Sequence, residues 1–182
     1  LTVLQTKGIL NKREFLIKLF QMQLEIFEKT RDVYLLDDKI NSVIIGYEKK
    51  KSKWSKQLIL SIQASSNLRH QISKSDYEIY AKNVKSLSKD IDLNWQKQFI
   101  KKNFYHINII AVAPEARGKG NAKVLINGII NHCKDNNIPI ILETVNSNQI
   151  EMYKHLGFDL VKTTSGNVTG LKQYCFIKYP HS

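Results

Sequence analysis

The residues best suited to chemistry stand in one short turn, RGKGNA, which places two glycines and two cations between an apolar run and a periodic segment. When a strand passes directly into a helix, the first backbone N–H groups of the helix are unpaired and can bind a phosphate group. Gly118 and Gly120 would let the main chain approach such a ligand closely, and Arg117 and Lys119 would add positive charge. The alternative is an ordinary glycine-rich connection, which a lone GxG pattern fits equally well.

Two further candidates are groups that could accept a proton. Glu143 is the single charge in the apolar run Ile138–Val145, and a carboxylate in such a strand needs a partner. We therefore interpret it either as a general base or as one half of an ion pair with a lysine or arginine. His106 would share one strand face with Asn108 and is a second candidate base, with a hydrogen-bonded structural histidine as the alternative.

Hydrophobic periodicity predicts the elements that carry these residues. The second half reads as strand, helix, strand, helix, strand, strand, with strands over 104–113, 138–145, 159–163 and 171–179, a helix from Ala122 to Cys133 and a short helix ending at Gly157. The first half predicts a helix over 12–29, strands over 33–36 and 40–48, an ambiguous segment over 57–63 and a helix from a Ser75 cap to about 100, open to interruption at 90–92. This order indicates an α/β protein with a mixed sheet and helices on its faces.

The turn belongs to neither of two common nucleotide-binding loops, since both GxxxxGK[ST] and GxGxxG are absent. It does fit the pattern V-x-P-x-x-[RQ]-x-x-G-x-[GA], through Val112, Pro114, Arg117, Gly120 and Ala122. A second pattern, N-x-x-A-x-x-x-Y-x-x-x-G-F, is matched downstream by Asn146, Tyr153, Gly157 and Phe158, with Gln149 departing at the alanine position. In this order and spacing the two motifs resemble those of the GNAT superfamily of acetyl-CoA-dependent N-acetyltransferases.

The resemblance implies a fold and an arrangement of the chain. The fold would be the GNAT type of α/β (α+β) fold, a mixed and mostly antiparallel central sheet with helices on both faces and a splayed pair of parallel strands that holds the cofactor. Residues 1–182 would form one domain, with the acceptor side in 1–103 and the acetyl-CoA side in 104–182.

The resemblance also implies roles for individual residues. The main chain of the strand end would bind the pantetheine arm, the turn would hold the pyrophosphate, and Asn146 would bind the arm or cap the next helix. Tyr153 matches the general acid that protonates the departing thiolate, with an aromatic packing residue on a short helix as the alternative. The residues implied in cofactor binding are Ile110, Ala111, Val112, Arg117, Gly118, Lys119, Gly120, Asn121, Ala122, Asn146 and Tyr153. The base stays open between Glu143, His106 and a water molecule.

The function implied is transfer of the acetyl group of acetyl-CoA to a primary amine of a small molecule or peptide, with no metal required. One alternative is an inactive CoA-binding sensor. Another is a basic nucleic-acid-binding protein, suggested by the net charge of +12 and by the cluster Glu48–Lys56 that contains Trp54. That alternative leaves both motifs unexplained, and the lysines are scattered along the chain, so it is the less favoured.

Composition sets the remaining expectations. The chain is 42% hydrophobic and 24% charged, as in globular proteins, and no apolar run could span a bilayer, so we expect a cytoplasmic protein without a membrane partner. Cys133 and Cys175 fall on apolar faces and are expected to be buried, reduced thiols, with neither a disulfide nor a metal site. The acceptor, the possibility of a homodimer and the completeness of an N-terminus that begins at Leu1 are left open.

Overall fold

The computed structural model describes residues 2–38 and 40–181, apart from the side chains of Val3 and Trp54. Contacts within the chain define two compact units, which are described separately. The helical unit comprises Leu1–Thr30, Lys53–Asp92 and Thr164–Lys172. The sheet unit comprises Arg31–Ser52, Leu93–Thr163 and Gln173–Ser182. The single domain over 1–182 stays a prediction.

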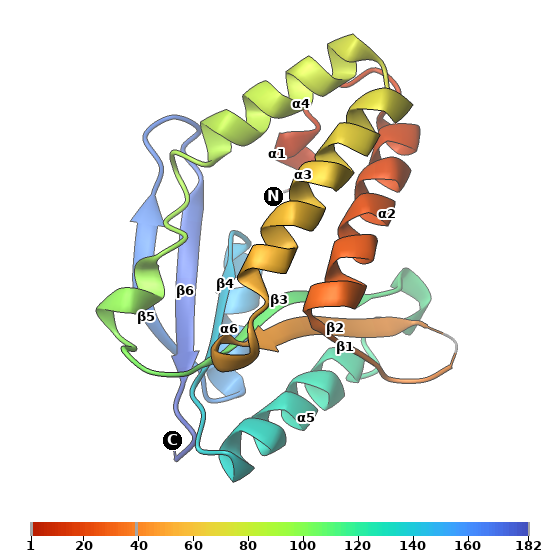
Figure 1. The fold of residues 1–182 in the computed structure, drawn as a ribbon. Coiled ribbons are helices and arrows are strands. Elements are labelled where there is room, and N and C mark those ends of the chain that lie inside the picture. The colour runs from red at the N-terminus through yellow and green to blue at the C-terminus, as the bar shows by residue number, and fades with distance from the viewer. Residues whose placement is uncertain (1, 39, 182) are drawn as a thin grey trace. The chain divides into compact units, whose positions relative to one another are not determined.

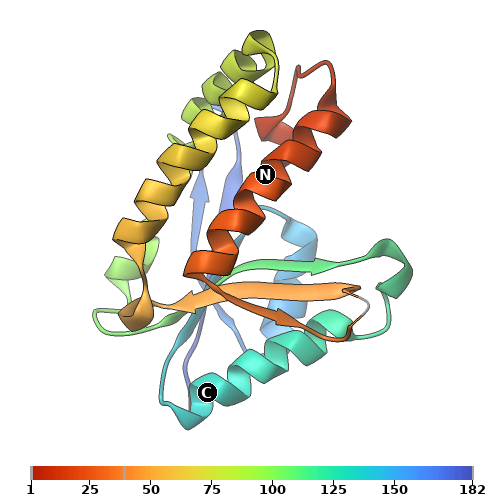
Figure 2. The ribbon, with the colours of Figure 1, turned by 45° about the vertical axis from the view of Figure 1, so that its right-hand side comes forward.

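The described part of the helical unit contains the helices α1 (Thr2–Gln5), α2 (Lys12–Thr30), α3 (Trp54–Gln71) and α4 (Lys74–Leu87). Helices α2 and α3 lie side by side in both ribbon views (Figures 1 and 2). Phe15 and Leu19 of α2 are buried in one apolar cluster with Leu68 of α3. The helix predicted over 12–29 is thus confirmed, and the ambiguous segment 57–63 is helical as part of α3, with Leu58, Ile59 and Ile62 exposed.

The start of α4 was predicted two residues too late. Ser73, and not Ser75, is the N-cap: its hydroxyl accepts a hydrogen bond from the backbone N–H of Asp76 at 3.1 Å. Both serines offer the same hydroxyl, and spacing alone did not distinguish them.

The end of α4 differs more strongly, since the helix stops at Leu87 and not near Ile100. Shortly after this point the buried carboxylate of Asp90 accepts hydrogen bonds from the backbone N–H of Val168 at 2.9 Å and from the hydroxyl of Thr169 at 2.6 Å. These long-range bonds hold the chain in a turn at Asp90, and no local pattern signals a partner almost eighty residues away.

The sheet has the order β1-β2-β3-β4-β6-β5 and confirms the expected mixed, mostly antiparallel arrangement (Figure 1). Its strands are β1 (Asp32–Leu35), β2 (Ser42–Glu48), β3 (Tyr105–Val112), β4 (Ile140–Thr144), β5 (Asp159–Ser165) and β6 (Lys172–Lys178). Strands β3 and β4 are parallel, whereas β1–β2, β2–β3 and β4–β6 are antiparallel pairs.

Strands β3 and β4 separate partway along their length. Their pairing begins at Tyr105–Ile140 and ends at Ile107–Leu142, although β3 runs on to Val112. The register of β2 on β3 shifts at the same place, from Gly46–Ile107 to Ile45–Ile109, which leaves Asn108 as the extra residue of a β-bulge. A bulge bends and twists its strand, so this one accounts for the divergence of β3 from β4.

The two faces of the sheet unit have different covers. On one face the apolar sides of α5 (Asn121–Asp135) and α6 (Ile150–His155) pack in a cluster that includes Leu125, Ile126, Ile129, Cys133, Ile107, Leu142, Tyr153, Phe158 and Phe176. On the other face Trp95 of the 3-10 helix η2 (Trp95–Gln98) packs with Ile100, Phe104, Ile141, Cys175 and Ile177. Both cysteines are buried free thiols, as expected.

Candidate active site

The glycine turn lies between β3 and α5, as the sequence predicted. After β3 comes the 3-10 helix η3 (Pro114–Ala116), and Gly120 is then the N-cap of α5. Gly118 and Gly120 have φ angles of +76° and +80°, in the left-handed region that favours glycine. A Cβ built on either residue would meet no described atom within 4 Å, so the main chain here faces open space.

The polar side chains of the turn fall into two groups. Arg117 and Lys119 are exposed, and Arg117 Nε donates to the carbonyl of Val112 at 3.2 Å. Asn121 Nδ2 donates to the hydroxyl of Ser42 on β2 at 3.1 Å, which fixes the start of α5 against the sheet. The turn is therefore anchored by Asn121 and presents the two cations to solvent.

Among the described residues, the end of β3 is paired with a strand on one side only. Ile110, Ala111 and Val112 pair with Ile44, Val43 and Ser42 of β2. Within the described residues, β4 offers no pairing to this part of β3. Backbone groups that point away from β2 are thus positioned to bind an extended ligand as a strand would.

Tyr153 lies on α6, in the apolar cluster on the α5 face. Its ring packs against Phe158 and Phe176, with ring centroids 6.1 and 5.3 Å apart, and only 5% of the residue is exposed. Burial raises the pKa of Tyr153 to about 12. The phenol therefore remains a neutral proton donor at any ordinary working pH.

Asn146 precedes α6 and begins the 3-10 helix η4 (Ser147–Gln149) as its N-cap. Its side-chain oxygen accepts from the backbone N–H of Asn148 at 3.1 Å. Gln149, which departs from the family pattern, accepts a hydrogen bond from the hydroxyl of Thr144 at 2.6 Å. Of the two roles predicted for Asn146, the structure shows the capping role.

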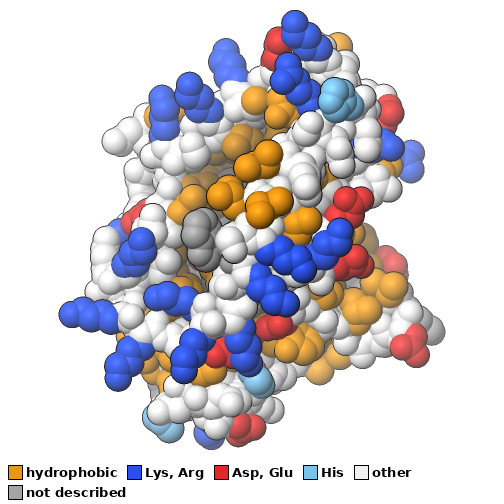
Figure 3. All heavy atoms as spheres, viewed as in Figure 1, with side chains coloured by type: hydrophobic (Ala, Val, Ile, Leu, Met, Phe, Trp, Pro, Cys, Tyr) orange, Lys and Arg blue, Asp and Glu red, His pale blue; other side chains and the backbone are white. Residues whose placement is uncertain are grey.

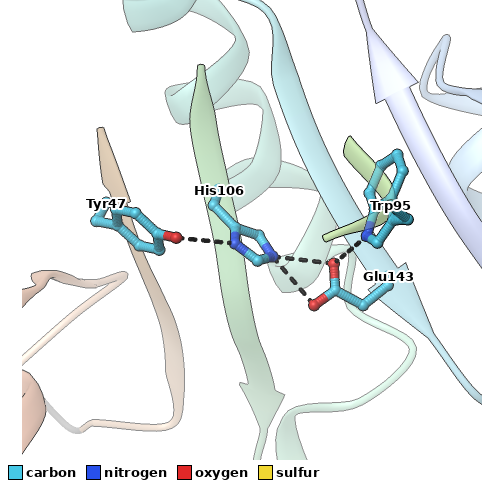
Figure 4. A network of polar contacts seen from close by, with 4 residues as sticks. All are labelled: Tyr47, Trp95, His106 and Glu143. Atoms are coloured by element: carbon cyan, nitrogen blue, oxygen red, sulfur yellow. Dashed lines mark hydrogen bonds and ion pairs between the residues drawn. The ribbon is translucent and has the colours of Figure 1, made fainter. Parts of the chain in front are cut away.

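The two candidate bases form one pair (Figure 4). His106 Nε2 lies 2.9 Å from Glu143 Oε2 and 3.1 Å from Oε1. Glu143 directly follows Leu142, the last residue of β4 paired with β3, so the pair lies where the strands begin to separate. The sequence offered an ion pair with lysine or arginine as the alternative for Glu143, and the partner is instead a histidine.

Two aromatic residues that sequence reasoning missed complete this network. Trp95 Nε1 donates to Glu143 Oε2 at 3.4 Å, and the hydroxyl of Tyr47 lies 3.4 Å from His106 Nδ1 (Figure 4). Tyr47 is the cross-strand partner of His106 in the β2–β3 register. The β2–β3 register would have identified Tyr47, but nothing in the sequence fixes that register. Asn108, expected beside His106, lies in the bulge and is exposed.

Several absences hold for the described residues. Within residues 2–38 and 40–181, no group of three or more His, Cys, Asp or Glu side chains is placed to hold a metal ion. Among the same residues, no helix combines the length and the apolar character needed to cross a bilayer.

Lys and Arg side chains are spread over the face seen in Figure 3. The side chain of Trp54, on which the nucleic-acid hypothesis drew, lies outside the described part of the chain.

Comparisons with known proteins bear on the class of this fold and site. A family model described as the acetyltransferase (GNAT) family matches residues 86–158. A solved structure described as histone acetyltransferase HPA2 and related acetyltransferase from Corynebacterium glutamicum has a TM-score of 0.59 and 17% identity, over 92% of this chain and 75% of that chain. No curated protein matches the sequence.

Two other solved structures are more distant. NAA60 from Arabidopsis thaliana in complex with acetyl-CoA has a TM-score of 0.45 and 16% identity, over 81% of this chain and 71% of that chain. The apo form of a mutant agmatine N-acetyltransferase has a TM-score of 0.49 and 12% identity, over 97% of this chain and 86% of that chain.

The fold is of the GNAT type: a bulged strand leaves its parallel neighbour, and a glycine turn precedes the following helix. Residues 86–158 match the acetyltransferase (GNAT) family model, and the chain shares the fold of the acetyltransferase structure from Corynebacterium glutamicum.

Proposed function

We propose that this protein transfers the acetyl group of acetyl-CoA to a primary amine of a small molecule or peptide. The observation that carries the proposal is the position of the His106–Glu143 pair where β3 and β4 separate. Groups able to accept a proton thus lie at one end of the part of β3 that has no partner in β4 among the described residues, and a glycine turn suited to phosphate lies at the other end.

The residues present fit the cosubstrate. Among the described residues the main chain of Ile110–Val112 has no pairing with β4, which leaves room for an extended pantetheine arm, and the open space beside Gly118 and Gly120 would admit a diphosphate to the N-terminus of α5. Exposed Arg117 and Lys119 add charge complementarity. When bound, acetyl-CoA supplies an activated acetyl thioester, and a backbone N–H of β3 would polarise its carbonyl.

Tyr153 would donate a proton to the departing thiolate. Its ring is held by Phe158 and Phe176, and its raised pKa keeps the phenol protonated. Tyr153 belongs to the α5 face of the sheet, whereas Glu143 belongs to the opposite face, with Trp95. The proton donor and the proton acceptor would therefore act from opposite sides of the opening between the strands.

The Glu143–His106 pair would take the proton from the acceptor amine. An ammonium group has no lone pair and cannot attack a thioester, so it must first lose a proton. The two side chains are 28% and 14% exposed, respectively, so the pair is partly open to an acceptor while held by Trp95 and Tyr47.

Thiol release from acetyl-CoA, measured against a panel of amines, aminoglycosides, polyamines and peptides, tests the proposal. Calorimetric titration with CoA tests cosubstrate binding separately. We expect CoA to bind and at least one class of amine to be acetylated, with the product confirmed by mass spectrometry. Failure of CoA to bind would refute the proposal, and binding without turnover on any amine would instead indicate a CoA sensor.

A further inference from the structure

We infer that the proton acceptor of this site is His106 Nδ1, that the hydroxyl of Tyr47 relays the proton to it, and that Glu143 is a positioning residue that selects the histidine tautomer. The inference rests on the proposed acetyl transfer and assigns its base. It follows from the hydrogen bonds at the two ring nitrogens of His106 (Figure 4).

The first step concerns Nε2. An ionised carboxylate has only acceptor atoms, and both oxygens of Glu143 lie within 3.1 Å of His106 Nε2. The contact is a hydrogen bond only when Nε2 carries the proton. Neutral His106 is therefore the Nε2–H tautomer, and its lone pair is on Nδ1.

The second step concerns Nδ1, which faces the hydroxyl of Tyr47 at 3.4 Å. Burial raises the pKa of Tyr47, so its phenol is neutral and can donate its proton to this lone pair. The separation is long for a hydrogen bond, as is common in catalytic sites that tighten when substrate binds. Tyr47 is thus the group that faces the Nδ1 lone pair of His106.

The third step concerns what holds these side chains. Trp95 Nε1 donates to Glu143 Oε2 at 3.4 Å, so both His106 and Trp95 orient the carboxylate. The guanidinium of Arg31 lies over the Tyr47 ring, 4.0 Å from its centroid, and the cation–π contact fixes the ring. Glu143 therefore serves to orient the imidazole of His106, and the Tyr47 hydroxyl is held close to His106 Nδ1.

The proton transfer balances without another reactant. An N–H bond of the ammonium group breaks as an O–H bond forms at Tyr47 Oη, while the original phenol O–H breaks and Nδ1–H forms on His106. The amine is left neutral with its lone pair free. The resulting imidazolium lies against the carboxylate of Glu143, which stabilises its charge.

The tautomer can be tested without any activity, by long-range ¹⁵N–¹H NMR of the imidazole nitrogens. A His106→Gln variant assigns the signal among the five histidines of the chain. We expect the Nε2–H tautomer in the native protein and a mixture of tautomers in Glu143→Gln, because an amide can either donate or accept. An Nδ1–H tautomer in the native protein would overturn the inference, whatever the enzyme does.

The relay can be tested by steady-state kinetics on an amine accepted by the native enzyme. Tyr47→Phe removes one hydroxyl and should lower kcat/KM for the amine by about 100-fold, in the range of general base catalysis, with the KM for acetyl-CoA unchanged. Tyr34→Phe is the matched control on neighbouring β1 and should remain within about twofold of the native enzyme. Native turnover in Tyr47→Phe would overturn the relay and leave the proposed function standing, whereas a native enzyme inactive on every amine would count against the function itself.

Discussion

Substitution of Gly120 by alanine tests the glycine turn most directly, and Gly170 provides a matched control. Gly120 has a φ of +80° and Gly170 a φ of +71°, and a Cβ on either would meet no described atom within 4 Å. Neither variant therefore introduces a clash. The cost in both variants is then the strain of holding an alanine in the left-handed region of φ.

That strain is about 1–2 kcal/mol, which corresponds to a fall in Tm of roughly 2–8 °C for a chain of this size. We expect the two variants to lose similar stability. Gly120→Ala should in addition weaken CoA binding, because the methyl group fills the space through which a diphosphate would approach the amides of α5. Each backbone hydrogen bond to a charged group contributes about 1.5–3 kcal/mol, so losing one lowers affinity by about 10- to 150-fold.

Thermal denaturation and calorimetric titration with CoA, run on both variants, separate the two effects. The expected pattern is a shared loss of Tm and a loss of affinity in Gly120→Ala alone. Native CoA affinity in Gly120→Ala would refute the assignment of this turn to the diphosphate, and an equal loss of affinity in Gly170→Ala would show that strain alone weakens binding.

Three other substitutions test particular contacts. Tyr153→Phe should lower kcat by at least about tenfold without weakening CoA binding, and unchanged turnover would remove Tyr153 from the mechanism. Because burial raises the pKa of Tyr153 to about 12, the kcat of the native enzyme should not fall through loss of this proton below about pH 11. Asp90→Asn should lower Tm at neutral pH, because hydrogen bonds from Thr169 and Val168 hold the pKa of Asp90 below its ordinary value. This stabilisation is present above the unfolded pKa of the carboxyl group and is lost as pH falls through its folded pKa. The Tm difference between the variant and the native protein should therefore shrink in acid, and a constant difference would contradict this account. Gly46→Ala should destabilise the protein by about 1–3 kcal/mol in chemical denaturation, since a Cβ there would lie 2.6 Å from the His106 carbonyl oxygen, and native stability would show that β2 can shift without cost.

The second half of the fold was predictable because its signals are local. The apolar spacing of α5, the continuous apolar run of β4 and the glycine turn each depend on residues a few positions apart. The structure confirms all three elements and their order. The end of α4 was not predictable, since it depends on bonds from Asp90 to residues 168 and 169.

The two candidate bases were predictable from the sequence, but their contact with each other and with Trp95 and Tyr47 was not. Sequence reasoning named Glu143 and His106 as competing bases, and the structure joins them although they are 37 positions apart. Their contact depends on the register of β3 on β4, and the approach of Tyr47 depends on the register of β2 on β3. Strand registers come from packing and from the bulge at Asn108, which no local pattern announces.

The separation of β3 from β4 also divides the amide protons of β3 into two populations. From Ile109 to Val112, those directed at β2 are held in a ladder, whereas those directed the other way have no pairing with β4 among the described residues. In deuterated water the second population should exchange quickly in the free protein and slow down when an extended ligand completes the ladder. Amide exchange along this single strand would therefore measure occupancy of the opening even for a ligand that never reacts.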